Sequence, residues 1–177
     1  IQWADANINL AQAYMNRDSS FTEEGIEEAI KYYKKALQVF TKTDFITDWA
    51  GTQTGLARIY VARIAGEKQE NLKEAIAYCE DALKIHTRKA FPFEWAKAQY
   101  VLGDSYLQLQ GKLATNVKQA ITCYKNALEV YKYETGRVIW AKINLNLGVA
   151  YQDYHQDNRA ENIKQAIACY ENAKKVF

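Results

Sequence analysis

The chain has 177 residues, of which 49% are apolar and 25% charged, a balance typical of a globular protein. Its 23 basic residues nearly cancel its 21 acidic ones, and a net charge of +2 excludes a basic footprint for nucleic acid or a membrane surface. No apolar run approaches the roughly 18 residues of a membrane span, and no signal peptide is visible, so we expect a cytoplasmic protein.

Four Trp-Ala pairs divide the chain into repeats. They begin at Trp3, Trp49, Trp95 and Trp140, in steps of 46, 46 and 45 residues. A period of this size predicts stacked supersecondary units rather than one globular core. We expect one repeat domain over residues 1–177 and a fragment of a longer protein, with repeats at about 1–43, 44–90, 91–135 and 136–177.

The first half of each repeat carries one apolar stripe. Seven, eight and eleven residues after the tryptophan come a leucine, a small residue and a tyrosine, as in Leu10, Ala11 and Tyr14. These offsets place the side chains on one face of a helix. We call it the A-helix. Because the tryptophans share one register, we expect all four to pack between neighbouring repeats.

The second half of each repeat carries a second helical stripe. In the first repeat it is formed by Ile26, Ala29, Ile30, Tyr33, Ala36, Leu37 and Val39, and equivalent stripes begin at Leu72, Val117 and Ile163. Spacings of 3, 4, 7 and 10 residues again indicate a helix. We call it the B-helix. The sequence therefore predicts an all-α chain of eight helices in four helix-turn-helix repeats.

Local signals mark the ends of these helices. Gly66 and Gly111 fit the left-handed position that follows an A-helix. Pro92 fits the first turn of an A-helix, and Thr43 or Asp44 is a candidate cap one repeat earlier. Three asparagines in one register before the B stripe either cap that helix or fix the loop, namely Asn71, Asn116 and Asn162.

The pattern Leu-small-x-x-Tyr, followed by Ala-x-x-x-Tyr and a further alanine, resembles the tetratricopeptide repeat. The family's unit has about 34 residues, so both helices here are expected to be extended. The longer unit is similar to kinesin light chains and, more closely, to cyanobacterial arrays that precede caspase-like CHAT proteases or nucleotide-binding modules. The resemblance implies a right-handed α–α superhelix whose A-helices line a concave groove.

The groove positions that the resemblance implies carry polar and varied side chains. We expect a peptide or protein partner to bind at eleven of them, namely Asn9, Gln12, Asn16, Arg58, Lys97, Tyr100, Asp104, Gln108, Lys142, Asn146 and Asp153. Amides suit a peptide backbone, because they both donate and accept hydrogen bonds. The alternative is a solvated inner face without a ligand.

No motif of the chain indicates catalysis, a metal or a cofactor. Phosphate loops, nucleophile elbows and paired ligands are absent from the sequence, so we expect no enzyme in this segment. His86 occupies a packing register, and His155 has no partner motif. The three cysteines form no C-x-x-C pair and are expected to be reduced thiols.

The sequence therefore favours a protein–protein interaction scaffold in a larger signalling or effector protein. The alternative is a self-association module, because the first A-helix and the last B-helix expose packing faces that favour end-to-end homo-oligomers. An enzymatic role would require a further domain outside these residues. We expect no nucleic acid or membrane among the partners.

Overall fold

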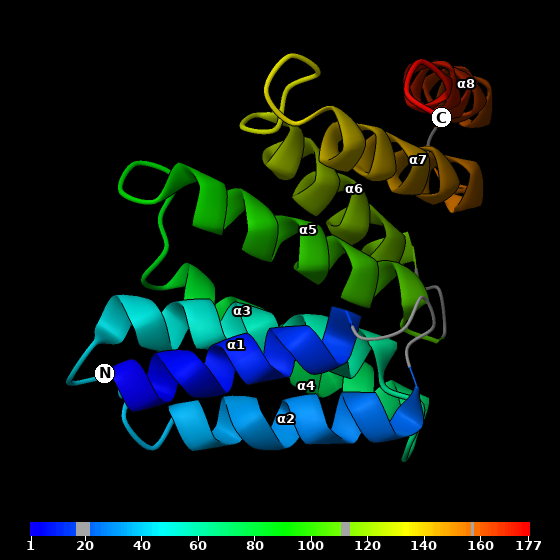
Figure 1. The fold of residues 1–177 in the computed structure, drawn as a ribbon. Helices are drawn as coiled ribbons and strands as arrows, with labels where there is room; N and C mark the ends of the chain where they lie inside the picture. Colours follow the sequence, from blue (N-terminus) through cyan, green and yellow to red (C-terminus); the bar gives the residue numbers. More distant parts are fainter. Residues whose placement is uncertain (17–21, 111–113, 157) are drawn as a thin grey trace. The chain divides into compact units, whose positions relative to one another are not determined.

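The computed structural model describes residues 1–16, 22–110, 114–156 and 158–177. This described part is all-helical, as predicted, and contains eight helices (Figure 1). The A-helices are α1 (Gln2–Asn16), α3 (Ile46–Ala62), α5 (Pro92–Gln108) and α7 (Arg137–Asp153). The B-helices are α2 (Glu23–Ala36), α4 (Lys68–Leu83), α6 (Ala114–Leu128) and α8 (Arg159–Lys174).

The helices form two compact units, over Ile1–Thr87 and Arg88–Phe177. In the first unit α1 packs on α2, α2 on α3 and α3 on α4. In the second unit α5 packs on α6, α6 on α7 and α7 on α8, and α5 also touches α7. Packing between consecutive helices is what an α–α repeat solenoid requires, because each hairpin buries its apolar stripe against its neighbour.

Helix α2 shows why these segments fold as helices. The side chain of Thr22 accepts a hydrogen bond from the backbone N–H of Gly25 at 3.1 Å and caps the first turn. Acidic residues occupy the first turn and lysines the last, which favours the helix dipole. The predicted stripe is buried, including Ile26, Ala29 and Tyr33.

The core of the first unit gathers around Trp49, which is 7% exposed and packs with Ala36, Phe40 and Ala82. The prediction that all four tryptophans pack alike is wrong. Trp3 is 53% exposed, because among the described helices α1 packs extensively on α2 alone. For the same reason Leu10 is 44% exposed.

The other two tryptophans are half-buried. Trp140 lies edge-on to Tyr133, with the ring centroids 5.3 Å apart, so a loop side chain covers part of it. The guanidinium of Arg88 lies 5.9 Å from the ring centroid of Trp95. A shared register therefore places the four indoles alike on their helices but does not give them alike neighbours.

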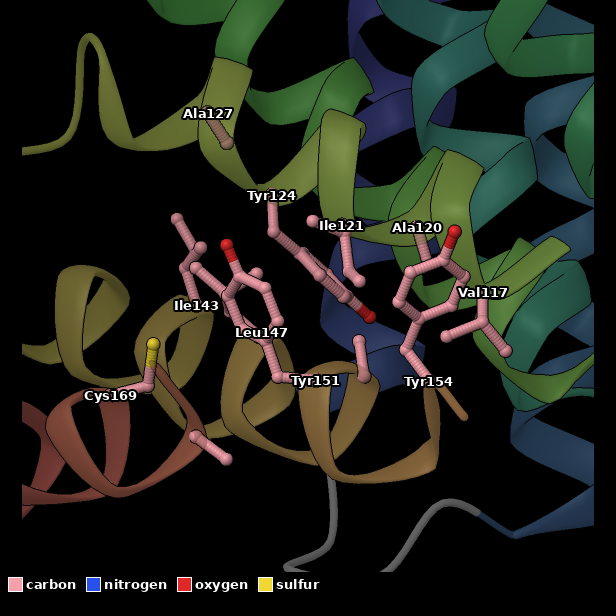
Figure 2. Packing of buried hydrophobic residues seen from close by; sticks show 12 residues of the cluster. Val117, Ala120, Ile121, Tyr124, Ala127, Ile143, Leu147, Tyr151, Tyr154 and Cys169 are labelled. Carbon is pink, nitrogen blue, oxygen red and sulfur yellow. The ribbon is translucent and has the colours of Figure 1, made fainter. Parts of the chain in front are cut away.

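The core of the second unit lies between α6, α7 and α8, and Figure 2 shows it at close range. Tyr124 of α6 is fully buried and lies against Leu147 and Ile143 of α7. Cys169 contributes from α8. All three cysteines of the chain are buried and none forms a disulfide, and burial raises the pKa of the Cys123 thiol to about 12. These thiols therefore pack as small apolar side chains.

A glycine on the A-helix makes room for a tyrosine on the B-helix of the same repeat. A Cβ atom on Gly103 would lie 2.7 Å from the Tyr124 ring, and one on Gly148 would lie 2.5 Å from the Tyr170 ring. In the second repeat the same two registers hold Ala57 and Cys79, both buried. The first repeat pairs Ala11 with Tyr33, and there the tyrosine ring lies instead against Gly55 of α3, where an added Cβ atom would be 2.6 Å away.

Of the residues predicted to begin or end helices, only some do so. Gly66 has φ +76°, in the left-handed region, but it lies beyond the Arg63 cap of α3. Gly111 lies outside the described residues. Pro92 opens α5 as predicted. Neither Thr43 nor Asp44 caps α3, since its N-cap position is Phe45, which has φ 59° and no capping side chain.

Asparagines in the predicted register fix loops rather than cap helices. The Asn71 amide donates to the Ala65 carbonyl at 2.9 Å, and the Asn162 amide donates to the carbonyls of Tyr154 and Gln156. Both asparagines lie inside the first turns of their helices. In the described part of the chain, no helix combines the length and the apolar character that crossing a membrane requires.

Substitutions at the most buried and the most exposed tryptophan, Trp49 and Trp3, test how much each indole contributes to stability. We expect Trp49→Ala to lower the free energy of unfolding by about 3–5 kcal/mol, because it truncates a buried aromatic side chain. Trp3→Ala is expected to cost less than about 1 kcal/mol, since half of the ring is already in water. Denaturant titrations of both variants measure the difference, and equal losses would contradict it.

Two glycine substitutions of opposite expected sign test the close approach of the helices. Gly103→Ala pushes a methyl group into the Tyr124 ring and is expected to destabilise the fold, with overpacking costing about 1–3 kcal/mol. Gly51 lies in α3, and a Cβ atom added there would be 4.0 Å from its nearest neighbour, the His86 side chain. Gly51→Ala is therefore expected to stabilise the fold by about 0.5–1 kcal/mol through helix propensity. Thermal unfolding of the pair distinguishes steric crowding from propensity.

Candidate binding surface on the A-helices

The structure places the predicted binding residues on all four A-helices but in two separate compact units. Asn9, Gln12 and Asn16 lie on α1 and Arg58 lies on α3, in the first unit. Asn16 ends its helix, and its side chain is outside the described part. The second unit holds Lys97, Tyr100, Asp104 and Gln108 on α5 with Lys142, Asn146 and Asp153 on α7.

These residues differ in how far they face water. Six are exposed, namely Asn9, Gln12, Arg58, Lys97, Gln108 and Lys142. Four are half-buried, namely Tyr100, Asp104, Asn146 and Asp153. The exposed residues present surface that a partner could reach, although Gln12 and Arg58 also interact with Tyr33, and the half-buried ones are held by neighbours of the same unit.

The side chains that the second unit brings together meet at Asp104. The hydroxyl of Tyr124 donates to Asp104 Oδ1 at 2.7 Å, and the amide of Asn146 donates to the same oxygen at 2.8 Å. Tyr100 also forms a hydrogen bond with this carboxyl group, and its ring centroid lies 6.2 Å from that of Tyr124. Three helices, α5, α6 and α7, therefore position one carboxylate, and we call these four residues the Asp104 cluster.

Burial sets the electrostatics of the Asp104 cluster. It raises the pKa of Asp104 to about 6, although the hydrogen bonds from Tyr124, Asn146 and Tyr100 act in the opposite direction. Burial and the nearby carboxylate also raise the pKa of both tyrosines, so their hydroxyl groups remain protonated donors at neutral pH. The cluster thus offers a carboxyl group that titrates close to neutral pH.

The first unit has a smaller counterpart around Tyr33 of α2. Its hydroxyl group forms hydrogen bonds with Gln12 of α1 and Arg58 of α3. Burial raises the pKa of Tyr33, while the charge of Arg58 and the two hydrogen bonds oppose that effect. In both units, then, a B-helix tyrosine reaches between two A-helices and holds predicted surface residues.

Sequence reasoning missed these tyrosines as members of the surface. The B-helix stripe places Tyr33, and Tyr124 in the equivalent position, in the core, and both rings are indeed buried. Their hydroxyl groups, however, project to the A-helix side. Tyr170 behaves in the same way in the fourth repeat and donates to Gln152 at 2.8 Å. The available signal was the choice of tyrosine over phenylalanine, because a buried hydroxyl group needs a polar partner.

Two exposed lysines border the Asp104 cluster. Lys97 lies three residues before Tyr100 and Lys142 lies four residues before Asn146, so each lies about one turn away on the same helix face. Lys142 also lines a pocket of about 440 Å³ at the start of α7, together with Gly136, Val138 and Ile139. The surface therefore combines cations, fixed amide and carboxyl groups, and a small apolar recess.

Replacing Asp104 with asparagine tests whether the raised pKa of its carboxyl group makes stability depend on pH. Because the folded-state pKa is raised above the ordinary value of 3.8, the wild type is expected to lose stability as pH rises from about 4 to 6. The loss should be on the order of 1–2 kcal/mol after solvent screening. Asp104→Asn keeps both acceptor contacts and should remove that slope. Denaturant titrations at several pH values compare the two proteins, and parallel curves would refute the assignment.

No protein-family model matches this chain, and no curated protein matches its sequence. The resemblance to tetratricopeptide repeats therefore rests on the residues of the chain itself.

Proposed function

We propose that this chain is a protein-interaction scaffold of the tetratricopeptide type, which binds a peptide or protein segment on the A-helix face of its repeats. It would serve as the docking part of a larger signalling or effector protein. The segment itself would bind rather than catalyse. Buried cysteines without a disulfide suit the reducing cytoplasm, where we place the protein.

The observation that carries this proposal is the Asp104 cluster with the lysines beside it. Directional donors and acceptors held at fixed positions reduce the conformational entropy that binding costs. Lys97 and Lys142 are exposed and would reach an acidic group or a backbone carbonyl of the partner. The apolar recess beside Lys142 would accept a side chain of the bound segment.

A charge-reversal variant tests the A-helix face. We expect Arg58→Glu together with Lys97→Glu to lose at least about tenfold in affinity for a partner captured from the source lysate, since two attractive contacts become repulsive. The matched control reverses Lys89 and Lys164, which are exposed lysines outside this surface. Calorimetric titration of the purified partner measures the affinity, and equal losses in both variants would count against the A-helix face.

Self-association is the second candidate function, and exposed apolar side chains at both ends of the chain favour it. Trp3 and Leu10 are open on α1, while Ile167 of α8 is 53% exposed and Phe177 is 70% exposed. Exposed packing faces of this kind promote contacts between copies. Light scattering over a concentration series separates the candidates, because a mass that rises with concentration and falls on Trp3→Ser favours self-association.

A further inference from the structure

A second pocket lies within the second unit, between the B-helices α6 and α8 and over α7. Its volume of about 480 Å³ falls in the range of ligand-binding pockets. Ile121, Tyr151 and Tyr154 form its apolar floor, and Figure 2 shows these side chains on α6 and at the end of α7. None of its lining residues belongs to the A-helix surface proposed above.

The α6 wall of the pocket carries two lysines, Lys118 and Lys125, at positions seven residues apart. A spacing of seven brings both to the same side of a helix, two turns apart. The ammonium group of Lys125 lies 5.4 Å from the centroid of the Tyr151 ring. Both lysines are exposed, and neither forms an ion pair with any other described residue.

The α8 wall does not neutralise these lysines. Its carboxylate, Glu161, lies in the first turn of α8 and accepts a hydrogen bond from the amide of Gln165 at 2.7 Å. Helix-dipole attraction also holds a carboxylate at that position. The pocket therefore has two cations against one carboxylate that is engaged on its own helix.

The first unit shows what fills the equivalent gap between α2 and α4. Ala29 and Ala120 occupy equivalent positions of the B-helix stripe. Glu27 and Lys118 each lie two residues before them, so the two are equivalent. Likewise, Arg63 and Tyr154 each lie three residues after the equivalent A-helix tyrosines, Tyr60 and Tyr151.

There the chain supplies both halves of an ion pair. Arg63 Nε donates to Glu27 Oε1 at 2.7 Å, and Arg63 Nη2 donates to Glu27 Oε2 at 3.0 Å. The guanidinium also lies 5.4 Å from the Tyr60 ring centroid. A carboxylate beside a cation and a tyrosine ring is thus the arrangement that closes this gap in the first unit. In the second unit Lys118 stands where Glu27 would supply the carboxylate, and the one carboxylate of the pocket, Glu161, is engaged on its own helix.

We propose that the pocket between α6 and α8 binds an acidic peptide segment, with one carboxylate between Lys118 and Lys125 and an adjacent apolar side chain on Ile121 and Tyr151. A singly charged carboxylate fits better than a phosphate, because Glu161 at the rim repels a dianion and no arginine fork is present in the pocket. The near-neutral chain also disfavours a polyanion such as RNA.

The test uses the full chain and the acetylated, amidated tetrapeptide Gly-Leu-Glu-Gly as the probe. We expect saturable chemical-shift changes at the backbone amides of Lys118, Thr122, Lys125 and Gln165 in nitrogen-15 correlation spectra. The matched peptide Gly-Leu-Gln-Gly, which lacks the carboxylate, should leave them in place. Saturation by both peptides alike, or by neither, would overturn the proposal.

Two double variants locate the binding. Lys118→Gln with Lys125→Gln should weaken the probe at least about fivefold, since both charge-assisted contacts are lost. Lys89→Gln with Lys164→Gln removes two exposed lysines outside the pocket and should leave the affinity unchanged. Dispersed spectra of each variant establish that it is folded. Equal affinity of the first variant and the wild type would overturn the site, as would displacement of the probe by equimolar inorganic phosphate.

Discussion

The structure depends on how closely the two helices of a repeat can approach each other. Where the A-helix carries glycine, at Gly103 and Gly148, the ring of a B-helix tyrosine lies on its backbone at a distance that would not admit a methyl group. Close packing of this kind is sensitive to single carbon atoms. It sets the separation within the two hairpins of the second unit, and hence where the outer faces of their helices lie.

The same contact links the core to the surface. The Tyr124 ring lies against Gly103 of its own repeat and the Tyr33 ring against Gly55 of the next one, and their hydroxyl groups meet Asp104 in the second unit and Gln12 with Arg58 in the first. The polar groups on the A-helix face are thereby held from below by the core. A change in the packing of the buried tyrosine rings would therefore also move the polar groups of the binding surface.

Much of the fold was predictable, because the period, the two stripes and Pro92 depend on patterns along one helix or between repeats. The burial of individual tryptophans was not, since Trp49 and Trp3 share a register and differ only in which helix lies beside them. Asp104 and Asn146 were predicted as surface residues from their positions in the A-helix repeat. Whether they bind a partner stays a prediction. Their contact with Tyr124 joins three helices, and no spacing rule along one helix reveals it.

The ion pair between Glu27 and Arg63 also bears on cooperativity. In stacked repeats, the free energy across each boundary decides whether neighbours open together or one at a time. This pair ties α2 of the first repeat to the end of α3 in the second, and its partly exposed side chains make it a modest, salt-sensitive contribution. The boundary between α6 and α7 has Lys118 and Tyr154 in those registers, which form no ion pair with each other, and it combines apolar contact with the shared hydrogen bonds to Asp104. Raising the ionic strength would therefore loosen the first boundary selectively, giving the two halves of the chain different responses to the same solvent.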